Sequence, residues 1–320
     1  MDVTLLQTFD LPEGLIVDGE IADTVKLSTV ISELLAPYAR ELASGVVASL
    51  PEPKTFVETI AVPKKDGATF VEQLAATLPE YLPLQLPEVY SDTQIISETP
   101  SAWSVLVGAA PKTVVDTYIS LFDRLKLIPL ALDVPAAAIS RSIVPADPPQ
   151  AYKSRAIIDL GRHRASLMVH DQGTIQFTVS LPISGDQVTK NIAQQLKLTT
   201  DQAEKAKVTC GLDPQKCEGV LKEVLSAMVG ELVQRLTEAR EFYQDRFPHG
   251  RPFDELMLCG GGAHLLELDT VLSEALHLPV RRADVWEHIK LAKPTTVSSP
   301  LQYATAVGLA LRALEPETLL

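Results

Sequence analysis

A short segment near the middle of the chain combines one carboxylate with a glycine in a pattern suited to phosphates and metal ions. An apolar run starts at residue 156 and ends at Asp159, Gly161 follows, and a second apolar run covers residues 165–169. Strand, Asp-x-Gly turn and strand place a carboxylate and bare backbone N–H groups at one tight bend. Glycine there admits a phosphate close to the main chain, and the carboxylate can orient a metal-bound water. The alternative is an ordinary meander in which Asp159 caps the turn.

Two predicted helices follow this segment and carry further candidates. One begins at Ser184-Gly185, where the first amides either face a phosphate or are capped by Ser184 itself. The other begins at residue 200 and places Glu204 and Lys207 one turn apart on one face. Its structural alternative is a capping box, because Asp201 precedes Glu204 by three residues.

A glycine-rich bend is the most specific motif in the chain. An apolar strand beginning at Leu256 leads into Gly260, Gly261, Gly262 and Ala263, and a helix is expected from about His264 to Leu276. Three glycines in sequence cost chain entropy, which a close approach of a flat ring or a phosphate to the backbone would explain. The alternative is a glycine-rich loop that packs a helix closely against a strand.

The order of these motifs resembles the nucleotide-binding lobe of the actin-like ATPase superfamily. More narrowly, the chain is similar to the PilM family of type IV pilus assembly, which also matches Leu50-Pro-Glu-Pro-Lys-Thr-Phe56 and a closing helix over residues 299–312. The resemblance implies an α/β, actin-like (ribonuclease H-like) two-lobed fold with an inserted small α+β subdomain. It implies ATP and Mg²⁺ as cofactors, with Glu204 accepting hydrogen bonds from the ribose, Lys207 lying along the sugar and Asp159 orienting the metal. The nucleotide-binding residues so predicted are Asp159, Gly161, Ser184, Gly185, Glu204, Lys207, Gly260, Gly261, Gly262 and Ala263.

The sequence departs from the family pattern in the parts that would handle phosphates. Relatives begin with a first phosphate hairpin, an apolar strand ending in Asp-x-Gly, which is missing here, so the chain is truncated or has lost that clamp. Pro135 stands where relatives tend to have a glutamate, and Ala165 replaces a frequent threonine. Proline cannot act as a base. We therefore assign no catalytic residue and expect at most a weak ATPase, with ATP affinity lowered from micromolar toward millimolar.

Composition limits the partners. The chain has 320 residues and a net charge of −13, and its one basic cluster, Arg162-His163-Arg164, is too small to bind nucleic acid alone. Three cysteines without paired Cys-x-x-Cys spacing predict neither a disulfide framework nor a zinc site, and a reducing cytosol is the simplest context. No signal peptide and no apolar run of ~18 residues is visible. A membrane role would therefore require another chain.

The positions of proline-rich stretches suggest that the chain is divided into three structural units. Residues 51–127 read as strand, helix, two strands and helix, which predicts a three-stranded sheet with helices on it, inserted into lobe one. The proline-rich stretch 145–150 predicts a boundary between lobes. Lobe one then comprises residues 1–50, 128–150 and 300–320, and lobe two, which binds the nucleotide, comprises residues 151–299.

By resemblance, the chain is expected to be a cytoplasmic scaffold of type IV pilus or related secretion assembly, peripheral to the inner membrane. It would bind the short cytoplasmic tail of a PilN-type membrane protein in a groove between the inserted subdomain and lobe one, lined by residues near 55–62 and 103–110. Other inner-membrane pilus assembly proteins are further expected partners. One alternative is an ATP-hydrolysing, filament-forming protein like FtsA, which should end in an amphipathic membrane helix. Another is an enzyme of the related sugar-kinase branch, for which no catalytic aspartate beside a sugar loop stands out.

Overall fold

The computed structural model describes residues 3, 5–147, 150–247, 250–289 and 300–314. Its strands are β1 (Ile16–Val17), β2 (Glu20–Ile21), β3 (Gly45–Ser49), β4 (Phe56–Pro63), β5 (Val89–Glu98), β6 (Ala102–Pro111), β7 (Ile128–Asp133), β8 (Arg155–Leu160), β9 (Ala165–Asp171), β10 (Thr174–Leu181), β11 (Glu255–Cys259) and β12 (Val280–Arg282). Its helices are α1 (Thr24–Leu35), α2 (Phe70–Thr77), α3 (Lys112–Leu125), α4 (Pro135–Ile143), α5 (Gly185–Leu196), α6 (Thr200–Cys210), α7 (Val220–Arg246), α8 (Leu268–Leu276) and α9 (Ala304–Ala313).

An eight-stranded sheet runs through most of the molecule, in the order β12-β11-β8-β9-β10-β4-β6-β5. Strands β8, β11 and β12 are parallel, whereas β8, β9 and β10 form an antiparallel meander. A separate parallel pair, β3 and β7, forms a small sheet of its own, in residues that the sequence analysis assigned to lobe one. The meander is the strand–turn–strand arrangement that the sequence around Asp159 predicts.

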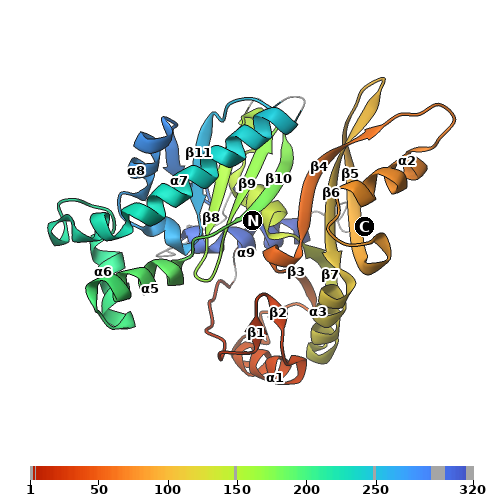
Figure 1. Ribbon diagram of the computed structural model, residues 1–320. Helices are drawn as coiled ribbons and strands as arrows, with labels where there is room; N and C mark the ends of the chain where they lie inside the picture. The colour runs from red at the N-terminus through yellow and green to blue at the C-terminus, as the bar shows by residue number, and fades with distance from the viewer. Residues whose placement is uncertain (1–2, 4, 148–149, 248–249, 290–299, 315–320) are drawn as a thin grey trace.

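The segment 51–127 does form three strands, but they are not an independent sheet. Strand β4 pairs with β10 at Phe177 and Glu58, and the Thr59 hydroxyl donates to the carbonyl of Ile175 at 2.6 Å. The expected three-stranded sheet is therefore the outer part of the large sheet, which leaves β5 as its free edge. Figure 1 shows β4, β5, β6 and α2 standing out from the rest of the molecule.

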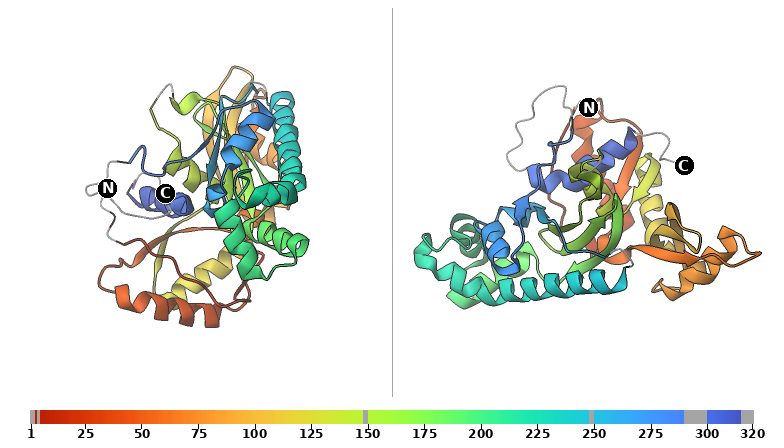
Figure 2. Two further views of the ribbon diagram at one scale, coloured as in Figure 1. Left: turned by 90° about the vertical axis from the view of Figure 1, so that its left-hand side faces the viewer. Right: turned by 90° about the horizontal axis from the view of Figure 1, so that it is seen from above.

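Helices cover the inner part of the sheet on both faces. Helix α7 has 27 residues and buries one stripe spaced for helical periodicity, which includes Leu221, Leu225, Leu232 and Leu236. These leucines belong to the same apolar cluster as the β8 to β11 side chains and the inward side of α4 and α9. Figure 2 shows α7 on one side of the strands and α9 on the other. The central strands are therefore buried on both faces, which explains their continuous apolar sequences.

Several local predictions are wrong at the level of single elements. The apolar residues of the segment 5–11 predict a short edge strand, but no strand forms there. The sequence of residues 214–246 predicts one long helical region, but the α-helix α7 begins only at Val220. After the glycine bend comes a 3₁₀ turn, Gly261–His264, and α8 starts at Leu268 because Glu267 adopts a left-handed conformation with φ of 61° that interrupts the helix.

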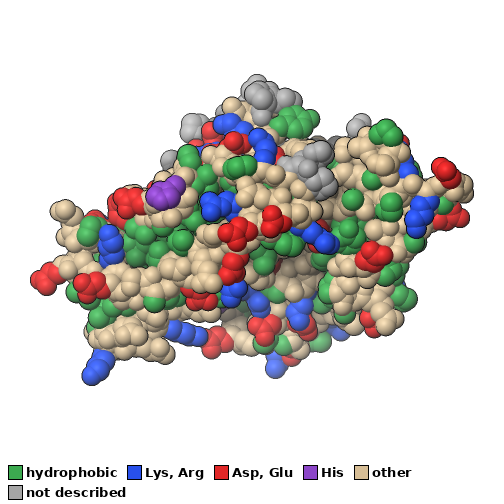
Figure 3. All heavy atoms as spheres, turned by 45° about the horizontal axis from the view of Figure 1, so that its top comes forward, with side chains coloured by type: hydrophobic (Ala, Val, Ile, Leu, Met, Phe, Trp, Pro, Cys, Tyr) green, Lys and Arg blue, Asp and Glu red, His purple; other side chains and the backbone are tan. Residues whose placement is uncertain are grey.

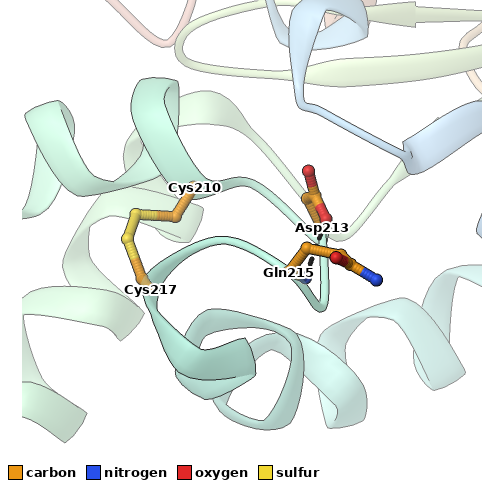
Figure 4. Close-up of a disulfide and its surroundings, with 4 residues drawn as sticks. All are labelled: Cys210, Asp213, Gln215 and Cys217. Atoms are coloured by element: carbon orange, nitrogen blue, oxygen red, sulfur yellow. Dashed lines mark hydrogen bonds between the residues drawn. A yellow bond between two sulfur atoms is a disulfide. The ribbon is translucent and has the colours of Figure 1, made fainter.

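The cysteine prediction is also wrong. Cys210 and Cys217 form a disulfide (Figure 4), with a Cα–Cα distance of 5.8 Å. Cys259 is free and buried. Cys210 ends α6, and the chain then folds back so that Cys217 returns to it. Sequence spacing alone does not reveal this reversal.

Figure 3 shows Lys and Arg side chains scattered among Asp and Glu on the face drawn. Among the residues that the structure describes, none of the helices has the length and apolar character needed to cross a bilayer.

Candidate functional site

Asp159 lies in a row of side chains that crosses the sheet. It pairs in register with Cys259 on β11 and with Ser166 on β9, and Ser166 pairs with Ser180 on β10. Side chains directly opposite on neighbouring strands point to the same face. The Cys259 sulfur accordingly lies 4.0 Å from an Asp159 carboxylate oxygen. Burial raises the pKa of Asp159 to about 6, so its negative charge is poorly compensated by the protein itself.

Glu52, which sequence reasoning did not select, closes this row from the start of the segment 51–127, just before β4. The Ser180 hydroxyl donates to both carboxylate oxygens of Glu52, each at 3.1 Å. Burial raises the pKa of Glu52, the hydrogen bond from Ser180 opposes that rise, and the charge of Asp159 adds to it. The one available signal was the Leu-Pro-Glu motif at residues 50–52, which the sequence analysis used for resemblance alone.

The start of α5 lies on the Asp159 hairpin, but its amides are already bonded. The N–H of Gly185 donates to the Gly161 carbonyl at 3.0 Å, and that of Asp186 donates to the Arg162 carbonyl at 2.8 Å. The Ser184 hydroxyl accepts a hydrogen bond from the backbone N–H of Gln187 at 3.2 Å, as an N-cap residue does. This geometry supports the capping role of Ser184 over phosphate binding by these amides.

Helix α6 brings Glu204 and Lys207 against α5. The Lys207 ammonium donates to Glu204 at 2.7 Å, to the Thr189 hydroxyl at 2.9 Å and to the Gly185 carbonyl at 3.2 Å. Burial opposes ionisation of Glu204, but hydrogen bonds from Lys207 and Thr189 prevail, and its pKa is lowered. The capping box of α6 is made by Thr199 and Gln202 rather than Asp201 and Glu204. Glu204, half-exposed and ionised, therefore keeps acceptor capacity for a ligand hydroxyl.

The three glycines of the bend have different reasons to be glycine. A Cβ on Gly260, whose φ is 79°, would lie 2.4 Å from an Asp159 carboxylate oxygen, and one on Gly262 would lie 2.9 Å from the Leu160 side chain. A Cβ on Gly261 would meet nothing within 4 Å. Packing thus accounts for Gly260 and Gly262, and Ala263 is fully buried. Gly261 is the exposed position at which a ligand can approach the main chain.

The glycines give a prediction that separates packing from ligand binding. Gly260→Ala should lower the free energy of unfolding by more than about 2 kcal/mol, since it meets both a positive φ and a close contact. Gly261→Val should leave thermal unfolding nearly unchanged but weaken ATP binding at least about tenfold. Thermal unfolding and nucleotide titration measure both effects. Equal loss of stability in the two variants would contradict the assignment of Gly261 to a ligand.

A second candidate site is a cavity of about 340 Å³ between the outer strands and lobe one. Five consecutive residues of the outermost strand β5, 90–94, line it together with residues of β4, β6 and β10. On the opposite wall, the Arg141 guanidinium forms an ion pair with the Asp133 carboxylate, with an N–O distance of 2.9 Å. The Arg312 guanidinium lies 3.9 Å from the same carboxylate. Gly108 also lines the cavity, and a Cβ there would meet nothing within 4 Å. We call this the edge groove.

The residues present suit a magnesium–nucleotide complex only in part. Mg²⁺ is commonly held by one or two carboxylates together with phosphate oxygens and water. Asp159, with its poorly compensated charge, fits that role, and Gly261 leaves room beside it. Within the described part of the chain, however, no group of three or more His, Cys, Asp or Glu side chains is placed to hold a metal alone. Any cation there would depend on the phosphates it accompanies.

The chain is similar to known proteins over almost its whole length. A family model described as type IV pilus assembly protein PilM matches residues 2–314. Among solved structures, the chain is similar to a PilM–PilN type IV pilus biogenesis complex, with a TM-score of 0.76 and 25% identity over 96% of this chain and 90% of that chain. The agreement extends over lobe one, the outer strands and lobe two together.

More distant likenesses share the fold. Ethanolamine utilization protein EutJ of Carboxydothermus hydrogenoformans has a TM-score of 0.52 and 14% identity, covering 93% of this chain and 77% of that chain. MreB5 of Spiroplasma citri bound to ADP has a TM-score of 0.56 and 13% identity, covering 95% and 79%. Cell division protein FtsA of Pseudomonas aeruginosa is 26% identical over 185 residues, 51% of this chain but 42% of FtsA, less than half of that protein. The actin-like fold is confirmed.

Proposed function

Since the chain belongs to the PilM family of type IV pilus assembly proteins, we propose that it is a scaffold that holds the cytoplasmic tail of a PilN-type membrane protein in the edge groove. The observation that carries this proposal is the groove itself, a cavity lined in part by β5, the outermost strand of the large sheet. An extended peptide can add to such an edge through main-chain hydrogen bonds. The similar solved structure is a complex of PilM with PilN.

The groove extends beyond the region that the sequence suggested. Strands β4 and β6 contribute Val57 and Gly108, as the ranges 55–62 and 103–110 anticipate, but β5 and α4 supply much of the rest. Arg141 of α4 pairs with Asp133 at the end of β7 and also donates to the Gly308 carbonyl of α9 at 3.0 Å. A peptide bound here would therefore contact both the outer strands and lobe one.

Nucleotide binding is the second part of the proposal. Three contacts support a weak ATP site in lobe two. Gly260 of the glycine bend lies against Asp159, the hairpin carbonyl of Gly161 accepts from Gly185 at the start of α5, and Lys207, paired with Glu204, donates to the Gly185 carbonyl. When bound, Mg²⁺ would neutralise phosphate charge, and Asp159 would orient it. Pro135 begins α4 and supplies no base, so nothing in that position favours hydrolysis. The FtsA likeness, limited to half the chain, does not favour a filament-forming ATPase.

A pair of titrations tests the proposal. A PilN-type tail peptide from the same organism should bind the full chain with a micromolar Kd, whereas ATP with Mg²⁺ should bind about a hundredfold more weakly. Phosphate release should stay near background. Calorimetry measures the binding and a phosphate assay the turnover. Turnover at ordinary enzymatic rates, with no peptide binding, would overturn the scaffold assignment.

As a scaffold for a membrane protein's tail, the protein would act at the cytoplasmic face of the membrane through its partner.

A further inference from the structure

The disulfide ties the end of α6 to the turn before α7. Cys210 is 2% exposed and packed in the core, whereas Cys217 is exposed. The loop between them contains few internal bonds: Asp213 accepts from the Gln215 amide at 2.8 Å through its side chain (Figure 4), and its carbonyl accepts from the Lys216 amide. Among the described residues, this is the single covalent cross-link. The disulfide therefore adds a covalent restraint to a loop that is otherwise held by hydrogen bonds.

The backbone beside Cys217 is held in an unfavourable conformation. Cys217, Glu218 and Gly219 have φ values of 49°, 56° and 75°, all in the left-handed region. Consecutive non-glycine residues there cost conformational energy and persist when surrounding structure holds them. The disulfide joins the first of these residues to the core. Opening it would let this turn relax.

The same loop is docked on the segment that follows the glycine bend. The N–H of Leu212 donates to the Leu266 carbonyl at 2.9 Å, and Leu212 is 1% exposed. Gly211 lies so close that a Cβ on it would be 2.7 Å from the Leu266 nitrogen. Helix α6, which carries Glu204 and Lys207, therefore reaches the glycine bend through the residues that the disulfide encloses.

The three cysteines differ in reactivity. The exposed Cys217 sulfur can meet a dissolved thiol or disulfide, whereas Cys259 is fully buried. Burial, and then the charge of Asp159, raise the pKa of Cys259 well above its ordinary value, which leaves little thiolate. Cys259 should therefore not react, and thiol–disulfide exchange should be confined to Cys210 and Cys217.

We propose that Cys210 and Cys217 form a reversible redox site, open to small disulfides such as oxidised glutathione, that controls how firmly α6 is held to the glycine bend. Oxidation begins when the Cys217 thiolate attacks oxidised glutathione, forming a mixed disulfide and releasing one glutathione thiolate. The Cys210 thiolate then attacks the Cys217 sulfur and releases the second glutathione. Two electrons pass to the glutathione disulfide, and the two thiol protons leave on the two glutathione molecules.

This site has a regulatory consequence that rests on the proposed function. In a reducing cytoplasm the pair is largely a dithiol, and oxidation closes it, as is usual for redox-sensing cysteine pairs. Closure fixes the loop, the docked Leu212 and the end of α6. Glu204 and Lys207 are then held in place for a nucleotide. Oxidising conditions would strengthen ATP binding without changing a residue that contacts it.

The test places the full-length chain in glutathione buffers of graded redox ratio. Alkylation and mass spectrometry should show one two-thiol transition at Cys210 and Cys217, with Cys259 unmodified throughout. Deuterium exchange over residues 204–219 and 262–268 should be faster in the reduced form. ATP should bind about three- to tenfold more weakly to the reduced form. No interconversion, or identical exchange in both forms, would overturn the redox site.

Two variants keep the outcome decisive. Cys217→Ser should behave like the reduced wild type in every buffer, and Gln215→Ala, which keeps both cysteines and its backbone hydrogen bond, should still respond. Altered exchange with unchanged ATP affinity would overturn the coupling to α6. If neither form binds ATP, the nucleotide part of the proposed function fails, while deuterium exchange still decides the redox inference.

Discussion

Asp159→Asn should make the ligand-free protein more stable while abolishing its Mg²⁺-dependent nucleotide binding. Burial raises the pKa of Asp159 to about 6 from an ordinary value of 3.8. At neutral pH the Asp159 carboxylate of the folded protein is therefore still ionised, although its buried surroundings disfavour a charge. Replacing it with a neutral amide should raise the free energy of unfolding by about 1–3 kcal/mol. Chemical denaturation and titration of ATP with and without Mg²⁺ measure the two effects.

The stability gain should depend on pH in a defined direction. A carboxyl whose folded pKa is raised binds protons more readily in the folded state, so it stabilises the fold as pH falls. The advantage of Asp159→Asn should be full above pH 6 and should fade as the pH falls from about 6 to about 4. Asp10→Asn, at a fully exposed side chain, serves as the control and should change stability by less than about 0.5 kcal/mol. A destabilised Asp159→Asn variant at pH 7 would contradict the account.

Gly108→Leu should abolish tail-peptide binding and leave the fold intact. Gly108 pairs with Val57 and Asp92 on its neighbouring strands, and all three line the edge groove. A Cβ at Gly108 meets nothing within 4 Å, so a leucine side chain should enter the groove rather than the core. We expect peptide affinity to fall at least about a hundredfold, because the side chain occupies the space that the peptide needs. Calorimetry with the tail peptide measures this.

A matched substitution controls for the added leucine. Gly230 lies on the exposed side of α7, and a Cβ there also meets nothing within 4 Å. Gly230→Leu should therefore bind the peptide as the wild type does. Retained binding in Gly108→Leu would place the partner elsewhere on the molecule. Loss of binding in both variants would show that the effect is not local to the groove.

Local sequence patterns predicted the elements that carry the candidate site. The apolar runs around Asp159 give β8 and β9, and the spacing of Glu204 and Lys207 puts them on one face of α6, where they share an ion pair. Both results follow from periodicities of two and 3.6 residues, which are properties of a few neighbouring residues. The family resemblance supplied the order of these elements and the fold that the comparisons confirm.

Long-range contacts are what the sequence did not reveal. The pairing of β10 with β4 joins residues more than a hundred positions apart, and the approach of Glu52 to Ser180 depends on it. The Cys210–Cys217 disulfide requires the chain to reverse direction. Part of that reversal uses left-handed conformations at Cys217 and Glu218, which are not glycines and so gave no sequence signal. The different roles of the three glycines likewise depend on where Leu160 and Asp159 lie across the sheet. The division into three units and the nucleotide-binding roles remain predictions.

The account places the partner tail and the nucleotide in two separate sites, one in the edge groove and one around Asp159 and Gly261. The most direct test is to titrate the PilN-type tail peptide into Gly108→Leu and Asp159→Asn by calorimetry under the same conditions. We predict that Gly108→Leu loses the peptide and that Asp159→Asn binds it within about twofold of the wild type. Peptide binding that survives in Gly108→Leu but disappears in Asp159→Asn would contradict the account.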